Sequence, residues 1–290
     1  MALVPTSTLV RPGQGICAFN VITLEHAEAI VAGAEAAGLP VVLQISENAV
    51  KFHGGRLAPI AAATAAVARS STADCSLHLD HVEAWDLLEQ APGNHFSSAM
   101  FDASKLDYAA NVAVTGRAAE FAHRHGLWLE SELGEVGGKD GAHAPGARTD
   151  PAEAAAYVAA TGVDALAVAV GSSHAMTSRD ARLDHGLIGE LREAVPVPLV
   201  LHGSSGVDDD ELHRAVAGGI VKVNVGTALN LAFTGRVREL LDASSSLVDP
   251  RKYLGPARDA MAETVARFLK VVSHVDTHHS HEPRSRRSKS

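Results

Sequence analysis

Eight short apolar runs recur along the chain, and this repetition constrains the fold more than any other feature. They are ICAFNV (16–21), PVVLQIS (40–46), CSLHLDH (75–81), SSAMFDA (97–103), LWLESEL (127–133), ALAVAVG (165–171), PLVLHG (198–203) and IVKVNVG (220–226). Short apolar runs rich in β-branched residues predict buried strands. Continuous apolar strands are typical of a parallel sheet that is covered on both faces.

Alanine-rich segments with helical periodicity lie between these runs. Examples are 24–38, 106–126 and 150–162, each ending in the glycine expected just beyond a helix. Eight strands that alternate with helices in a chain of 290 residues predict a (β/α)₈ barrel. The alternative, a doubly wound sheet that binds a dinucleotide, would need a glycine fingerprint at the first helix, and NVITLEHAEA lacks one.

Residues 1–272 are predicted to form a single barrel domain. Segment 249–272, DPRKYLGPARDAMAETVARFLKVV, is expected to form a turn and a terminal helix that closes over the barrel. The tail that follows, 273–290, contains four histidines and is rich in arginine and serine. Because it has too little apolar content to build a core, we expect it to be disordered.

Charge and composition exclude several classes of function. The net charge of −9 argues against binding to nucleic acid or to an anionic membrane. No apolar run reaches the roughly 18 residues that a membrane span requires, and MALVPTSTLV has no pattern of a signal peptide. The two cysteines, Cys17 and Cys75, lie inside apolar runs and indicate neither a disulfide framework nor a thiolate metal site. We therefore expect a cytoplasmic protein.

Polar residues gather where the predicted strands end. In chain order they are Asn20, Ser46, Asp80 with His81, Asp102, Glu132, His174, His202 and Asn224. The functional groups of a (β/α)₈ barrel cluster at the carboxyl ends of its strands. These side chains are therefore predicted to ring one mouth of the barrel.

Three of these residues are histidines that have the pattern of a catalytic metal site. Neutral imidazoles at His81, His174 and His202 can hold a divalent transition metal with one coordination position open for substrate. One histidine at a strand end means little in a chain that has sixteen, so the prediction depends on the three together. His78 precedes Asp80 by two positions on the same strand face, where it would either orient a neighbour or pack in the core.

Three glycine-containing turns favour a phosphorylated ligand. GSSHA, HGSSG and NVGT follow the sixth, seventh and eighth runs. Any one of them is an ordinary turn, but barrels often bind phosphate in the loops after strands seven and eight.

A family resemblance rests on six motifs in one order: LHLDH, ELGEVGGKDG, GSSHA, LHGSSG, KVNVGT and DPRKYLGPARDAM. Over about residues 5 to 272 the chain resembles the class II, metal-dependent ketose-bisphosphate aldolases, which include the fructose- and tagatose-bisphosphate aldolases. The resemblance implies a zinc-dependent lyase, a homodimer or homotetramer, that accepts Co²⁺ in place of Zn²⁺ and uses Na⁺ or K⁺. It implies cleavage of a ketose 1,6-bisphosphate, most simply fructose 1,6-bisphosphate, to dihydroxyacetone phosphate and glyceraldehyde 3-phosphate through a zinc-stabilised enediolate.

The resemblance also implies roles for individual residues. His81, His174 and His202 would hold the zinc, with Glu132 as an alternate contact, and Asp80 would act as the acid and base at the aldehyde oxygen. His78 and Asp102 are expected to support these groups from behind. Substrate contacts are expected at Asn20, Ser46, Gly203, Ser205, Asn224, Gly226 and Thr227, with Asn224 helping to hold the enediolate.

The chain departs from the family pattern at three positions. Lys139 and Asp140 stand where the family has a glutamate that exchanges the C1 proton, so Asp140 becomes the candidate base. Ala175 replaces a glycine, and Ala228 replaces an acidic residue. These changes leave two alternatives open. The protein would be a related aldolase for tagatose bisphosphate, a deoxy-ketogluconate phosphate or a sulfosugar phosphate, or a metal- and sugar-phosphate-binding protein without turnover. Lys222 raises a mechanistic alternative, Schiff-base chemistry, or is structural.

Overall fold

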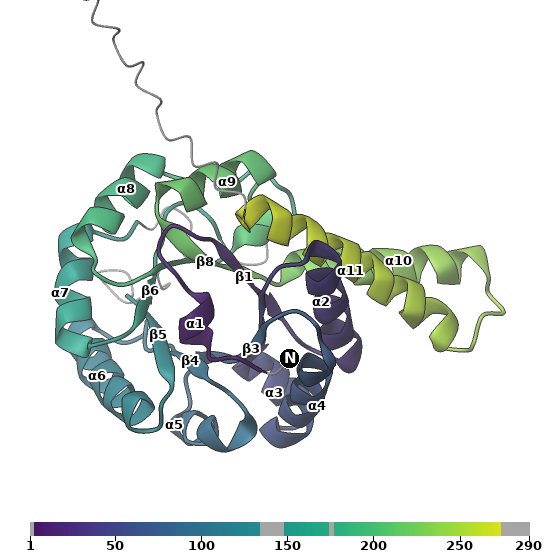
Figure 1. Cartoon of the computed structure of the whole chain (residues 1–290), viewed down its shortest axis with the longest axis horizontal. Helices are drawn as coiled ribbons and strands as arrows, with labels where there is room; N and C mark the ends of the chain where they lie inside the picture. Colours follow the sequence, from purple (N-terminus) through teal and green to yellow (C-terminus); the bar gives the residue numbers. More distant parts are fainter. Residues whose placement is uncertain (1–2, 134–147, 174–176, 274–290) are drawn as a thin grey trace, which may run out of the picture.

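Eight parallel strands form the centre of the molecule. The computed structural model describes residues 3–133, 148–173 and 177–273. Within these ranges each strand pairs with the next along the chain, and β8 pairs with β1 to close a barrel (Figure 1). The strands are β1 Ile16–Asn20, β2 Val41–Ser46, β3 Cys75–Val82, β4 Ser98–Phe101, β5 Trp128–Glu132, β6 Ala165–Ala167, β7 Leu199–Leu201 and β8 Ile220–Val225. The predicted (β/α)₈ barrel is confirmed, and every predicted run contains a strand.

Helices surround the barrel and alternate with its strands (Figure 1). The helices longer than two turns are α2 Leu24–Ala37, α4 Leu57–Ser70, α6 Tyr108–Arg124, α7 Pro151–Thr161, α8 His185–Ala194, α9 Asp209–Gly218, α10 Thr227–Ala243 and α11 Arg251–Ser273. The short ones are α1 Thr6–Leu9, α3 Glu47–Phe52, α5 Trp85–Leu88, η1 Pro92–Asn94 and η2 Ser204–Gly206. None of these described helices has the length and apolar character needed to cross a membrane.

The helix ends follow the residue types in the sequence. Gly38 and Gly162 adopt left-handed conformations, with φ of 67° and 70°, just after α2 and α7. Asp107 and Asp150 accept hydrogen bonds from the first turns of α6 and α7. A glycine without a Cβ meets no steric penalty at the left-handed stop, and an aspartate satisfies an N–H that the first turn leaves unpaired.

Some strands are shorter than their apolar runs. β6 ends at Ala167, although the run continues to Gly171, and β7 ends at Leu201, so that His202 lies just past it. Beyond Ala167 the chain makes other hydrogen bonds, since Thr149 donates from its backbone N to the Ala169 carbonyl. Because these two strands end early, the polar residues that follow them, such as His202, lie on loops and not in the sheet.

The amino-terminal end of the barrel is closed by α1. Thr6 Oγ1 lies 2.7 Å from Ser98 Oγ, and Ser98 is the first residue of β4. Figure 1 shows α1 lying across this end of the barrel. The opposite end, where the strands terminate at their carboxyl ends, is the one left for a site.

The predicted terminal helix is present as α11, and it packs beside the barrel against α2. Gly33 allows this contact, because a Cβ there would lie 2.6 Å from the Ala262 carbonyl oxygen of α11. Phe268 is fully buried and meets Phe19 of β1 edge to face, with ring centroids 6.3 Å apart. The helix therefore contributes to the same core as the strands.

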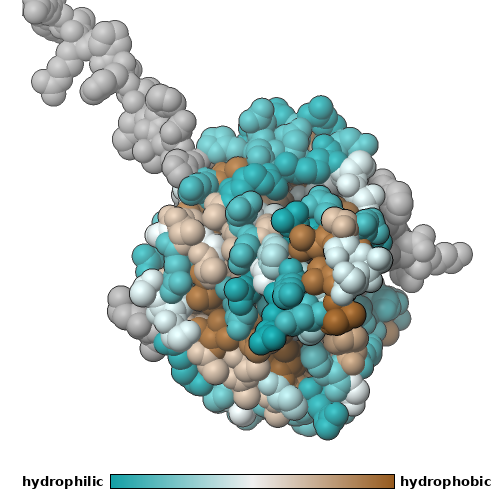
Figure 2. Space-filling view, turned by 90° about the vertical axis from the view of Figure 1, so that its right-hand side faces the viewer, coloured by the Kyte–Doolittle hydropathy of each residue, from teal (hydrophilic) through white to brown (hydrophobic). Residues whose placement is uncertain are grey.

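The first part of α11 and nearly all of α10 project from the barrel as a hairpin (Figure 1). Of the residues of α10, only Leu229 is buried. Leu231, Leu241 and Val248 leave 48%, 38% and 85% of their surface exposed. Figure 2 looks at this side of the molecule and shows brown apolar residues among teal polar ones.

Candidate functional site

A cavity opens at the carboxyl ends of the strands. It is lined by most of the residues predicted from the sequence to form a site, namely Asn20, Ser46, Asp80, His81, Asp102, Glu132, Gly203, Ser205, Asn224, Gly226 and Thr227. His78 and His202 lie buried next to these residues. His174, Ala175, Lys139 and Asp140 lie outside the described residues.

Asp80 and His81 are consecutive residues of β3, yet both line the cavity. In a regular strand neighbouring side chains point to opposite faces. His81 avoids this alternation because its φ is +48°, and the pairing of β3 with β4 shifts register between Leu79 and Val82. A left-handed conformation is uncommon for a residue with a Cβ and typical of functional positions.

Asp102 orients the ring of His81. His81 Nδ1 lies 2.9 Å from Asp102 Oδ2, so that Nδ1 donates to the carboxylate and, in the neutral ring, the lone pair is on Nε2. Burial lowers the pKa of His81, but the Asp80 carboxylate and the hydrogen bond to Asp102 outweigh burial and raise the pKa to about 10. The His81 ring therefore lies in a strongly negative environment that attracts cations.

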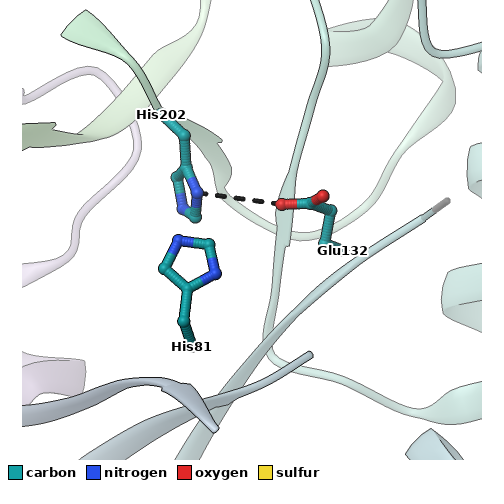
Figure 3. Close-up of side chains that lie close together, drawn as sticks. All are labelled: His81, Glu132 and His202. Atoms are coloured by element: carbon teal, nitrogen blue, oxygen red, sulfur yellow. Dashed lines mark ion pairs between the residues drawn. The ribbon is translucent and has the colours of Figure 1, made fainter. Parts of the chain in front are cut away.

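Three potential metal donors converge from β3, β5 and the residue just after β7. His81, Glu132 and His202 each offer one ligand atom, and these atoms lie within 4.8 Å of one another. His202 Nδ1 is 3.8 Å from Glu132 Oε2, and the His81 and His202 rings are 4.9 Å apart (Figure 3). Two imidazole nitrogens with a carboxylate oxygen are a donor set found in catalytic zinc sites. The residues present therefore fit a zinc ion.

Asp80 lies in the most buried part of the cavity wall. It is 1% exposed, and burial raises the pKa of its carboxyl group. Gln44 Nε2 lies 3.4 Å from Asp80 Oδ2 and 2.5 Å from Asn20 Oδ1, so Gln44 links the two cavity residues. A carboxyl group with a raised pKa binds a proton more readily than a solvent-exposed aspartate, which suits a group that takes up and returns a proton. Sequence reasoning missed Gln44, although it lies two positions before Ser46 on the same strand face.

His78 lies behind Asp80, away from the opening. Its Nδ1 is 2.8 Å from Ser98 Oγ, and its Nε2 is 3.8 Å from Asp80 Oδ1. Burial, followed by the charge of Lys222, lowers the pKa of His78 well below its usual value. His78 is therefore a neutral, buried side chain that contacts Ser98 through Nδ1 and lies next to Asp80 through Nε2.

The loops after β7 and β8 bring backbone close to the cavity. Gly203 has φ of +67°, and a Cβ there would lie 2.5 Å from the backbone carbonyl of Ser173. Ser205 Oγ accepts from the backbone N of Ala228, which ties the two loops together. The 17-residue helix α10 begins at Thr227, on the cavity wall. A helix amino terminus and a glycine turn together suit an anionic group.

Two charged residues form a pair inside the barrel. Glu130 of β5 and Lys222 of β8 are both fully buried, with Lys222 Nζ 2.7 Å from Glu130 Oε2. The same Nζ lies 2.8 Å from Asn224 Oδ1. A buried lysine held as an ammonium ion is not a nucleophile, which counts against Schiff-base chemistry. Sequence reasoning missed Glu130, although it precedes Glu132 by two positions and a charge inside an apolar run is itself a signal.

Comparisons with known proteins agree with this geometry. Residues 9–277 match the family model described as fructose-bisphosphate aldolase class-II. A fructose-bisphosphate aldolase of Thermus caldophilus is 36% identical over 290 residues, covering 91% of this chain and 94% of that protein. A fructose-bisphosphate aldolase of Geobacillus stearothermophilus is 37% identical over 250 residues, covering 85% and 87%.

Solved structures show the same fold. The YdjI aldolase of Escherichia coli K12 superposes with a TM-score of 0.78 at 30% sequence identity, over 90% of this chain and 92% of that one. The fructose-bisphosphate aldolase of Campylobacter jejuni gives a TM-score of 0.76 at 23% identity, with 90% of each chain covered. At that lower identity the likeness shows the fold alone.

Proposed function

The chain belongs to the class II fructose-bisphosphate aldolase family of lyases, and we propose that it catalyses the reversible aldol cleavage of a ketose 1,6-bisphosphate. Fructose 1,6-bisphosphate is the simplest substrate, and the products are dihydroxyacetone phosphate and glyceraldehyde 3-phosphate. The observation that carries the proposal is the convergence of His81, Glu132 and His202 beside the buried carboxyl of Asp80. The names of the related proteins support the same substrate.

The resident metal in this proposal is zinc, with cobalt as a substitute. His81 would hold it through Nε2 and His202 through Nδ1, because the other nitrogen of each ring faces a carboxylate. Glu132 contributes an oxygen, and His174, outside the described residues, is the further histidine that we propose as a ligand. A bound divalent ion would supply Lewis-acid polarisation of the substrate carbonyl. A monovalent cation, Na⁺ or K⁺, is proposed alongside it.

Asp80 is proposed to move the proton at the C4 oxygen. In the cleavage direction Asp80 takes the proton of the C4 hydroxyl, the C3–C4 bond breaks, and its electron pair stays with the ketone half. In condensation Asp80 returns the proton to the aldehyde oxygen. Its low exposure and its raised pKa support this role. The proton on the ketone half is assigned to Asp140, which lies outside the described residues.

Substrate orientation is assigned to the cavity wall. Asn224 is 7% exposed and can donate from its amide to a substrate oxygen. Gly203 and Ser205 on one loop, with Gly226 and Thr227 on the other, are proposed to hold a phosphate near the start of α10. Asn20 and Ser46 complete the wall on the side of β1 and β2. His78 and Asp102 support Asp80 and His81 from behind.

A coupled assay tests the proposed function. Release of dihydroxyacetone phosphate is followed across fructose, tagatose and other ketose bisphosphates, with and without a chelator. We expect metal-dependent release from fructose 1,6-bisphosphate. Turnover of another ketose phosphate alone would identify a related aldolase, and no turnover of any member by the zinc-loaded protein would contradict the proposal.

We further propose that the enzyme is a cytoplasmic homodimer or homotetramer. The exposed apolar side chains of the α10–α11 hairpin support association with a second copy, because such contact would remove their apolar surface from water. Both cysteines are free and buried, as expected in a reducing compartment. Light scattering on the protein as it elutes from a size-exclusion column measures the molar mass of the oligomer, and a monomeric mass would contradict the association.

A further inference from the structure

The pair of Lys222 and Glu130 calls for a reason beyond stability. The two residues come from β8 and β5, which are not neighbours in the barrel, so their contact crosses its interior. Taking both charges out of water costs several kcal/mol per ion, and apolar side chains of similar volume often replace such a pair without loss. The presence of this buried pair is therefore explained better by its contacts with His202 and Asn224 than by stability.

Glu130 determines which nitrogen of His202 carries the hydrogen. Glu130 Oε1 lies 2.9 Å from His202 Nε2. A carboxylate only accepts, so a neutral His202 places its hydrogen on Nε2 and leaves the lone pair on Nδ1. Nδ1 is the nitrogen that faces Glu132, at 3.8 Å. This tautomer is the one that a metal ligand needs.

A competing contact shows why a carboxylate is required. Asn224 Nδ2 lies 3.0 Å from His202 Nε2. In the absence of the Glu130 charge, the Asn224 amide can donate to Nε2, and the imidazole hydrogen then moves to Nδ1. A hydrogen on Nδ1 must be lost before a metal can bind there. Glu130 prevents this arrangement, because its lone pairs would repel a bare Nε2 at hydrogen-bonding distance.

Lys222 determines the orientation of the Asn224 amide. An ammonium group only donates, so the Asn224 atom at 2.8 Å from Nζ is the carbonyl oxygen, Oδ1. The amide nitrogen, Nδ2, must then lie on the other side. Because Glu130 already accepts the hydrogen of His202 Nε2, the hydrogens of Nδ2 remain available to a substrate oxygen at the cavity wall.

We propose that Lys222 and Glu130 act together as a positioning pair that prepares His202 to bind metal and Asn224 to donate to substrate, an inference that rests on the proposed metal-dependent cleavage. Lys222 donates to the Glu130 carboxylate and to the Asn224 carbonyl oxygen. Glu130, held in this way, accepts the hydrogen of His202 Nε2. Neither residue touches the reacting atoms. One buried pair thus positions two groups from different elements, His202 just after β7 and Asn224 in β8.

Glu130→Gln is the decisive variant. The carbonyl of the introduced amide would turn to Lys222, so its NH₂ group would face His202 and favour the tautomer with hydrogen on Nδ1. We expect zinc affinity, measured by competition with a chromophoric chelator on the metal-free protein, to fall about 10–100-fold. In Lys222→Met at saturating zinc, kcat should fall while KM changes little, because the Asn224 amide is then free to turn.

Glu211→Gln is the matched control. Glu211 is also a buried carboxylate that contacts a histidine, with His185 Nε2 at 3.0 Å, and arginines, Arg182 and Arg214. It lies on α9, away from the cavity. We expect its variant to lose stability and to keep its zinc affinity. Equal zinc affinities for Glu130→Gln and the parent protein, with only a stability loss, would overturn the proposal.

The parent protein provides a test that needs no stable variant at Glu130. The ¹⁵N shifts of His202 in the metal-free protein, assigned by their absence in His202→Asn, report the tautomer. Hydrogen on Nε2 is expected, and hydrogen on Nδ1 would overturn the proposal. Neither the zinc affinity nor the tautomer depends on turnover, so failure of this inference is distinguishable from failure of the proposed reaction.

Discussion

Asp80 and His81 are adjacent in β3 and face the same cavity, because the left-handed conformation of His81, with φ of +48°, interrupts the alternation of the strand. One group is a buried carboxyl whose pKa is raised by burial, and the other is an imidazole held by Asp102. The group that we propose for proton transfer therefore lies directly beside a proposed metal ligand.

Asp80→Asn should separate proton transfer from metal binding. The change keeps the shape of the side chain but removes its capacity to take a proton, so kcat should fall by about 10²–10⁴-fold while bound zinc stays stoichiometric. Elemental analysis and steady-state kinetics on the same sample measure both. Asp102→Asn is the matched variant, and it should weaken zinc binding about 10–100-fold, because the Asn carbonyl would stay with Ser104 and the NH₂ group would replace the acceptor that faces His81. Loss of zinc from Asp80→Asn in proportion to activity would make Asp80 a ligand instead.

Removal of metal should abolish cleavage. Exhaustive chelation would take away the ion that we propose is held by His81, Glu132 and His202, and added zinc or cobalt should restore the rate. The buried, ion-paired Lys222 offers no alternative route. Activity that survives chelation, together with a substrate adduct that borohydride fixes on a lysine, would contradict the metal mechanism.

Gly203→Ala should destabilise the protein more than Gly54→Ala. Both glycines have φ of +67°, so both variants carry the left-handed cost of about 1–2 kcal/mol. At Gly54 the added Cβ meets nothing within 4 Å, whereas at Gly203 it lies 2.5 Å from the Ser173 backbone. This overpacking should add about 1–3 kcal/mol for Gly203→Ala. Urea unfolding measures the difference, and equal losses would show that the Ser173 loop moves freely out of the way.

Thiol labelling should be slow in the native protein and should accelerate with pH. Burial raises the pKa of Cys75 to about 11, and burial also raises the pKa of the fully buried Cys17. Because the thiolate is the reactive form, little reaction is expected at pH 8. The unfolded thiols ionise near pH 8.5, so the stability that these groups contribute is complete below that pH and declines as pH rises towards 11. Mass spectrometry after iodoacetamide treatment, with and without urea, measures both cysteines. Rapid native labelling at pH 8 would contradict their burial.

The fold was largely predictable because its signals are local. Apolar runs, alanine-rich segments and terminal glycines each depend on residues close in sequence, and the barrel followed from their number and order. Seven of the eleven predicted residues that line the cavity were likewise found from their positions at strand ends, and the other four, Gly203, Ser205, Gly226 and Thr227, were expected from the family resemblance. The ends of β6 and β7 were predicted too late, because apolar residues continue past the point where the ladder stops.

What the sequence by itself determined is the order of the elements and the residue types at the carboxyl ends of the strands, since periodicity and helix stop signals act over a few residues. Only the tertiary structure decided that Asp80 and His81 face one cavity, because the left-handed φ of His81 is not indicated by the residue type or its neighbours in sequence. Only the closed barrel brings Glu130 to Lys222, 92 positions later, and thereby orients His202 and Asn224. Such pairings depend on the register of strands around the barrel, which no local pattern encodes.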